Sequence, residues 1–199
     1  MLQNILRQTT KATLVLASIA FVAMPLTAAA ANTTVSVSVA GVISTFTTSG
    51  TVTLGALTPN ITGTQSTNND VVTVSTNDTD GFTLTLQDAD VTRTLASGGN
   101  SFAAGAGTPA VPAALANNTW GWRVDGLSAF GAGPTATINN AAPSALTYAG
   151  IPANASAFTL LATATTGSQV TDVWYSARAN DTQPTGTYTD VVTYTATVN

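Results

Sequence analysis

Threonine alternates with apolar residues over much of the chain, and this period of two restricts the fold more than any other feature. Successive side chains of a β-strand point to opposite faces of a sheet, so such a segment carries one apolar and one hydroxyl face. The clearest case is residues 187–199, which predict a long C-terminal strand. Its apolar face is expected to carry Tyr188, Val192, Tyr194, Ala196 and Val198.

Further segments with the same alternation are predicted as strands, at 34–39, 71–76, 82–86, 158–162 and 173–179. Clusters of Asn, Asp, Pro and Gly supply turn geometry between them, at 58–60, 67–70, 77–81, 97–100 and 180–186. Short strands between turn signals predict an all-β fold, an antiparallel β-sandwich of Ig-like or jelly-roll-like type. Stretches rich in Ala, Gly and Pro predict long surface loops near 97–118 and 131–144.

Residues 1–31 have the three-part layout of a secretory signal peptide. Arg7 and Lys11 come first, an apolar run follows at 12–26, and small residues then lead to an expected cleavage after Ala31 or one residue earlier. The apolar run is shorter than the roughly 20 residues that span a bilayer. We therefore expect a signal-peptide helix that is removed, no membrane anchor after cleavage, and a secreted protein on the cell surface.

Residues 32–199 are long enough for a single β-sandwich domain with its own core. The chain has no Cys, so disulfides cannot stabilise this domain and packing must do so. Three arginines face nine aspartates there, which leaves a net charge of −6. Nucleic acid is excluded as a partner because binding to phosphate needs clusters of Lys and Arg.

Residues 32–199 contain no His, Cys, Lys or Glu, so few side chains there can titrate or attack a substrate near neutral pH. A Ser or Thr nucleophile has no His or Lys to activate it, and a zinc site has neither imidazole nor thiolate. Only Asp remains for acid–base chemistry, and all of it lies in or beside predicted turns and strand ends. The inventory predicts that the protein is not an enzyme.

Calcium is the one cofactor that the sequence suggests. Asp78 and Asp80, with Asn77 beside them, place hard oxygen ligands on one predicted turn, and Asp88 and Asp90 follow closely. The spacing does not match an EF-hand. Asp and Asn side chains also stabilise turns by themselves, so this turn needs no metal to explain it.

Trp120 and Trp122 are two residues apart and are expected to share one face of a strand. Exposed, they would form a contact surface for a glycan or a cell-wall polymer. Buried, they would anchor the core, which is the more usual role of aromatic side chains. Arg123 points to the opposite face and is expected at the surface.

The segments 120–124, Trp-Gly-Trp-Arg-Val, and 186–198, Gly-Thr-Tyr-Thr-Asp-Val-Val-Thr-Tyr-Thr-Ala-Thr-Val, resemble exported, Thr-rich bacterial β-sandwich proteins of the cell surface, and most nearly the WxL-domain family. That family carries a Trp-x-Leu motif, where this chain has Trp-x-Trp. The resemblance implies noncovalent attachment to the peptidoglycan of the cell wall.

The last segment also resembles the terminal strand of pilus- and coat-type subunits, which polymerise by lending an N-terminal strand to a neighbour. Residues 33–39, Thr-Thr-Val-Ser-Val-Ser-Val, have the alternation that a donor strand needs. The leading hypothesis is a structural or adhesive surface protein whose partners are a cell-wall polymer or other surface proteins. Self-assembly by strand donation is the alternative, and a carbohydrate-binding module is the second alternative.

Overall fold

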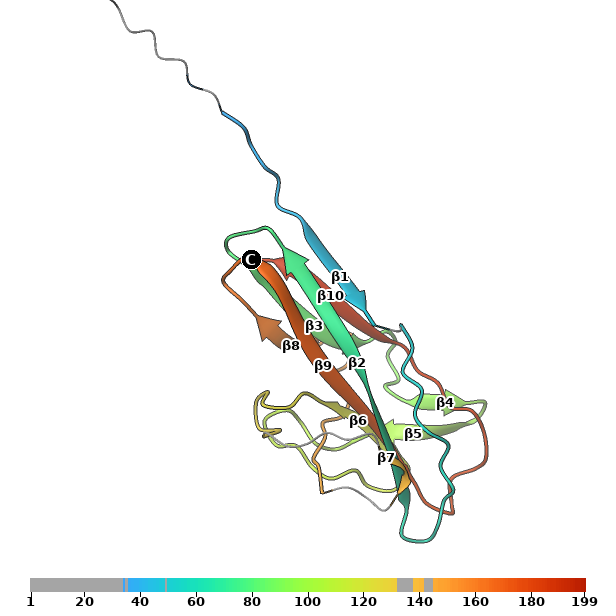
Figure 1. The fold of residues 1–199 in the computed structure, drawn as a ribbon. Helices are drawn as coiled ribbons and strands as arrows, with labels where there is room; N and C mark the ends of the chain where they lie inside the picture. Colours follow the sequence, from blue (N-terminus) through green and yellow to red (C-terminus); the bar gives the residue numbers. More distant parts are fainter. Residues whose placement is uncertain (1–33, 35, 49, 132–137, 142–144) are drawn as a thin grey trace, which may run out of the picture. The chain divides into compact units, whose positions relative to one another are not determined.

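The computed structural model describes residues 34, 36–48, 50–131, 138–141 and 145–199, and every regular element among them is a β-strand (Figure 1). The predicted all-β class is therefore confirmed. The expected signal-peptide helix at 1–31 lies outside the described residues. The strands are β1 (Ile43–Thr47), β2 (Thr64–Thr76), β3 (Phe82–Asp88), β4 (Leu95–Ser97), β5 (Asn100–Ala104), β6 (Thr119–Arg123), β7 (Ile138–Ala141), β8 (Phe158–Ala162), β9 (Gly167–Ala179) and β10 (Val192–Val198).

None of the described residues belongs to a helix long and apolar enough to cross a membrane. Residues 39–199 form one compact unit, and all ten strands belong to it.

The larger sheet is built on the pairing of β2 with β9, each 13 residues long (Figure 1). Their antiparallel register runs without a shift from Thr64 opposite Ala179 to Thr76 opposite Gly167. The sheet order is β1-β2-β9-β6-β5-β4, and β7 pairs with β2 beside this path. Every other strand of this sheet therefore connects directly or through a neighbour to the β2–β9 pair.

One pair in the larger sheet corrects the prediction of a wholly antiparallel fold. β5 and β6 are parallel, with Ala103 opposite Thr119 and Ala104 opposite Trp120. Parallel neighbours need a crossover connection that returns the chain to the same end of the sheet, and residues 105–118 provide it. Leu115 of this connection is buried, so the loop expected near 97–118 contains β5 and part of the core.

The smaller sheet has the order β10-β3-β8, and both of its pairs are antiparallel. Phe82, Leu84 and Leu86 of β3 are fully buried and alternate with partly exposed residues, as the period of two predicts. The predicted apolar face of the C-terminal strand is largely confirmed. Tyr194 and Ala196 pack against the core, whereas Val198 is 44% exposed at the end of the strand.

One hydrophobic cluster draws its side chains from both sheets, including β2, β6 and β9 of the larger sheet and β3 and β8 of the smaller. A hydrogen bond of 2.7 Å between the phenol oxygens of Tyr175 on β9 and Tyr194 on β10 joins the sheets inside this cluster. Burial raises the pKa of both phenols, so both are neutral and one donates to the other.

Several sequence predictions of local structure are wrong. The polar run 67–70 was expected to be a turn but lies within β2, because the ladder with β9 continues through it. The side-chain amides of this run bond to other segments of the chain. Asn68 Nδ2 donates to the Thr53 carbonyl, and Asn69 Nδ2 donates to Asp172 Oδ1. The described residues of 34–39 lie in no strand. The loop expected near 131–144 includes β7.

We predict that Tyr194→Phe lowers the free energy of unfolding by about 1–2 kcal/mol, because it leaves the buried phenol of Tyr175 without its partner. Urea unfolding measures the change. Tyr188→Phe is the matched control, since the Tyr188 hydroxyl donates to the Pro184 carbonyl at the surface. An equal or larger loss in the control would contradict a structural role for the bond between the sheets.

Candidate functional site

The predicted calcium turn at Asp78 and Asp80 is explained by its own hydrogen bonds. The Asp80 N–H donates to Asp78 Oδ1 at 2.9 Å, and the Asp78 N–H donates to Thr76 Oγ1 at 3.0 Å. Gly81 follows with a φ of 79°, which closes the connection between β2 and β3. Among the residues that the structure describes, these two carboxylates belong to no group of three acidic side chains.

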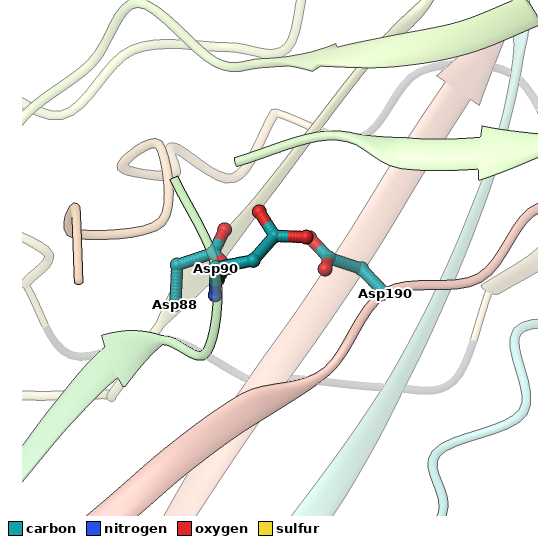
Figure 2. A group of neighbouring side chains, drawn as sticks. All are labelled: Asp88, Asp90 and Asp190. Carbon is teal, nitrogen blue, oxygen red and sulfur yellow. Dashed lines mark hydrogen bonds between the residues drawn. The ribbon is translucent and has the colours of Figure 1, made fainter. Parts of the chain in front are cut away.

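A different set of acidic side chains does converge. Asp88 ends β3, Asp90 follows two residues later, and Asp190 precedes β10 (Figure 2). One carboxylate oxygen from each lies within 4.8 Å of the others. The register of β3 with β10 explains why these side chains lie close together. Asp88 is opposite Val192, and the Ala89 N–H donates to the Val191 carbonyl at 2.9 Å. Continuing this antiparallel pairing by one step brings Asp190 beside Asp90.

Each carboxylate of this acidic cluster uses its Oδ1 atom to hold the local backbone. Asp88 Oδ1 accepts from the Asp90 N–H at 2.8 Å, and Asp190 Oδ1 accepts from the Val191 N–H at 2.8 Å. Asp90 Oδ1 accepts both the N–H and the hydroxyl of Thr92. These bonds fix the side chains and leave the Oδ2 atoms of Asp88 and Asp190 buried without a hydrogen-bond partner.

Burial makes this cluster electrostatically unfavourable when fully ionised. It is the main cause that raises the pKa of Asp190 to about 6, and the charges of Asp88 and Asp90 add to the effect. Burial also raises the pKa of Asp88, although the nearby Arg93 acts against it. Hydrogen bonds from Thr92 lower the pKa of Asp90. The cluster therefore gains from any added positive charge, whether a proton or a cation.

A cavity of about 1070 Å³ adjoins the cluster, and Asp190 lies in its wall. The extended segment 50–57 lines one side of the cavity and residues 183–194 another. Five aromatic side chains contribute to its wall: Phe102, Trp120, Tyr175, Tyr188 and Tyr194. The cavity is thus largely apolar and aromatic, with the acidic cluster at its edge.

The two tryptophans that were candidates for a glycan or wall contact lie in the core. Trp120 is 3% exposed and Trp122 is 0% exposed. Their indole N–H groups donate to the carbonyls of Arg93 and Gly150. Rings enclosed in this way cannot stack on a sugar at the surface, so the structure agrees with their role as core anchors.

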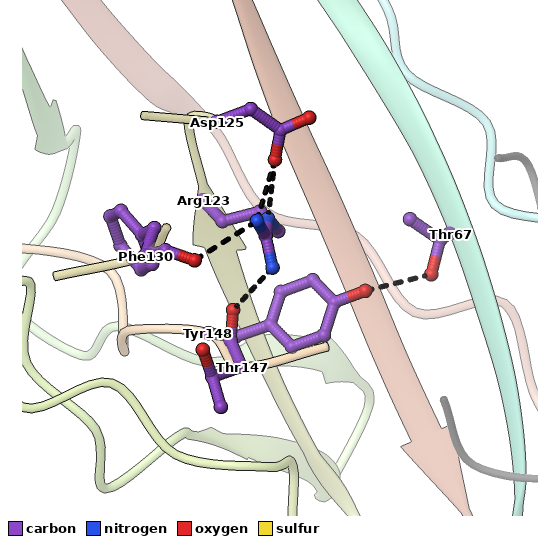
Figure 3. A network of polar contacts seen from close by, with 6 residues as sticks. All are labelled: Thr67, Arg123, Asp125, Phe130, Thr147 and Tyr148. Carbon is purple, nitrogen blue, oxygen red and sulfur yellow. Dashed lines mark hydrogen bonds and ion pairs between the residues drawn. The ribbon is translucent and has the colours of Figure 1, made fainter. Parts of the chain in front are cut away.

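Arg123 corrects the prediction of a surface group, since it is only 1% exposed. Its guanidinium forms a salt bridge of 2.6 Å with Asp125 and donates to the carbonyls of Thr147 and Phe130 (Figure 3). Its hydrogen-bond partners come from two segments that follow β6, with Asp125 and Phe130 in the first and Thr147 in the second. Arg123 thus ties two connections to the sheet, and it is not positioned as a ligand contact.

Comparison with known proteins gives no matching family model, no matching curated protein and no matching solved structure. The acidic cluster is the candidate site that sequence reasoning missed. The Asp88-x-Asp90 spacing was visible, but its third member is about 100 residues away along the chain. Only the β3–β10 register brings Asp190 to it, and alternation alone does not determine a register.

We predict that the change in the free energy of unfolding caused by Asp190→Asn is about 1 kcal/mol more stabilising at pH 7 than at pH 4. Urea unfolding in EDTA at both pH values measures it. The folded-state pKa of Asp190 is raised to about 6, so its contribution to stability is full below the unfolded pKa, near 4. That contribution is lost as the pH rises through 6. The variant has no such loss.

Asp90→Asn is the control of opposite sign. Hydrogen bonds from Thr92 lower the pKa of the wild-type Asp90 carboxyl. This carboxylate therefore stabilises the fold above about pH 4 and loses this effect in acid. A stability difference for Asp190→Asn that stays constant between pH 4 and pH 7 would contradict the account of the cluster.

Proposed function

We propose that this protein is an exported structural or adhesive protein of the cell surface, acting through its faces and binding the cell wall noncovalently. The observation that carries this proposal is that the two tryptophans and the arginine considered as ligand contacts from the sequence are not on the protein surface. Trp120, Trp122 and Arg123 are all buried. Outer strand faces instead present hydroxyl groups, as Thr159 on β8 and Thr195 on β10 do.

The same reasoning supports a non-catalytic role. Asp88 is fully buried, so a substrate would reach only Asp90 and Asp190 of the acidic cluster. A carboxylate pair that hydrolyses a bond must contact the reacting atoms from both sides. We infer binding as the activity. We interpret the two sheets around one core as a sandwich of Ig-like or jelly-roll-like type that is antiparallel except for the β5–β6 pair.

Export is supported by the composition of residues 1–31, which lie outside the described residues. With that segment removed, the chain has only three basic residues, and Arg123 is buried against Asp125. The resulting acidic, hydroxyl-rich exterior favours a polymer bound by hydrogen bonds over an anionic one. The glycan strands of peptidoglycan have the required hydroxyl and amide groups.

We predict that the protein co-sediments with purified peptidoglycan, is released by denaturant, and occurs in the cell-surface fraction of the producing cell. Bovine serum albumin, another acidic protein, is the control for nonspecific sedimentation. Recovery only from the cytoplasmic fraction would contradict export. Recovery at the surface without sedimentation on peptidoglycan would contradict wall binding and favour a protein partner.

Assembly by strand donation is the second candidate, and exposed valines near the N-terminus favour it. Val37 and Val39 are 87% and 79% exposed, and no strand includes them. Their alternation with Ser36 and Ser38 provides one apolar face that is unused in the described chain. β1 is an edge strand of the larger sheet and offers backbone groups to an added strand.

We predict for this candidate that Val37→Asp with Val39→Asp abolishes high-mass species in unboiled gels and filaments in electron micrographs. The matched control is Ser36→Asp with Ser38→Asp, which adds the same charge to the other face of the segment. Equal loss of assembly in both double variants would indicate a charge effect and contradict strand donation. A wild-type protein that stays monomeric at high concentration would also contradict it.

A further inference from the structure

We propose that the acidic cluster binds a divalent cation through Asp88, Asp90 and Asp190, and that calcium is the cation it fits. The ion would join the end of β3 to the segment that precedes β10. This site differs from the turn that the sequence suggested, because Asp78 and Asp80 complete their own turn. Such a site would bind the ion whether or not the protein is exported.

The buried, unpartnered oxygen of Asp88 is the observation that points to a ligand. Asp88 is 0% exposed, and no N–H or hydroxyl group donates to its Oδ2 atom, so its remaining polar neighbour is the carboxyl group of Asp190. Asp190 Oδ2 is likewise buried and unpartnered on the facing segment. An ionised carboxylate oxygen left in this way is costly unless a cation or a proton occupies the space beside it.

The surrounding protein does not supply that positive charge as an ion pair. Arg93 is the cation whose charge acts on Asp88, but its Nη1 donates to the Ile151 carbonyl at 3.4 Å. In the described part of the chain, the salt bridge between Arg123 and Asp125 does not include any of these three carboxylates. The negative charge of the three carboxylates is therefore not neutralised by an ion pair, and a bound cation would neutralise it.

The ligand chemistry selects the cation. All three donors are carboxylate oxygens, and the chain has no His or Cys to favour zinc or another soft metal. The donor atoms lie within 4.8 Å of one another. Two oxygens bound to one calcium ion at about 2.3–2.6 Å are at most about 5 Å apart, so this spacing suits calcium. Asp90 is exposed, which leaves one side of the site open to the water molecules that complete the coordination.

A proton shared between Asp88 and Asp190 is the competing explanation for the two buried oxygens. It would satisfy both atoms without any metal, and the raised pKa of Asp190, to which a hydrogen bond with Asp88 contributes, is compatible with it. The two explanations differ in their response to calcium at pH 7.5, where a cation competes well with protons.

The test is thermal unfolding of the purified protein at pH 7.5 in EDTA and in 10 mM CaCl₂, with calorimetric titration of CaCl₂ alongside. We predict that calcium raises Tm by about 5 °C, as a site of submillimolar affinity would in a chain of this length. The titration should show one calcium ion per chain.

Two variants locate the site. Asp190→Asn should fold at least as well as wild type in EDTA, because it removes a buried charge, and should lose the calcium-dependent rise in Tm. The matched control, Asp78→Asn with Asp80→Asn, removes two carboxylates from the other acidic turn and should keep the full rise. Asp90→Asn changes an exposed ligand, so it should fold normally and bind calcium at least 10-fold more weakly.

Absence of calcium binding by wild type up to 10 mM would overturn the proposal and favour the shared proton. Loss of the calcium response in the Asp78 and Asp80 double variant, with retention in Asp90→Asn, would also overturn it and return the site to the turn after β2. If Asp190→Asn fails to fold, the titrations of wild type and Asp90→Asn decide the matter by themselves.

Discussion

The pairing of β2 with β9 is the interaction on which the rest of the larger sheet depends. It is an unbroken antiparallel register of 13 residues on each strand. β1 and β7 attach to β2, and β6 attaches to β9. A ladder of this length satisfies the backbone of polar residues that would otherwise favour turns, which is why Thr67 and its neighbours are extended. The alternating residues of the two strands then supply one wall of the core.

Because connections cover part of the outer face of this ladder, polar side chains become buried there and must find partners. Thr67 Oγ1 bonds to the hydroxyls of Ser176 and Tyr148, and Gln65 Nε2 donates to Ser176. The Arg123 guanidinium is satisfied by Asp125 and two carbonyls on the same side of the sheet. Burial of a charge is tolerated when it is paired and hydrogen-bonded, and Arg123 makes four such bonds. The Oδ2 atoms of Asp88 and Asp190 differ, because they are buried and no N–H or hydroxyl group donates to them.

Alternation in the sequence predicted the strands whose two faces differ most. The segment 158–162 matches β8 in both bounds, and β3 and β10 follow the predicted faces. It failed where a strand is buried on both faces, as at the Thr64 end of β2, because polar and apolar positions no longer separate there. Trp120 and Trp122 were correctly placed on one face, but whether that face is covered depends on elements far along the chain. The acidic cluster depends on the β3–β10 register, which local sequence does not specify.

We propose that a cation binds the carboxylates of Asp88, Asp90 and Asp190 where β3 and the segment before β10 meet. Anomalous X-ray scattering from crystals grown in calcium chloride tests this most directly. We expect an anomalous peak about 2.3–2.6 Å from carboxylate oxygens of Asp88, Asp90 and Asp190. A structure without that peak, in which Asp88 and Asp190 carboxyl oxygens form a short hydrogen bond with each other, would contradict it.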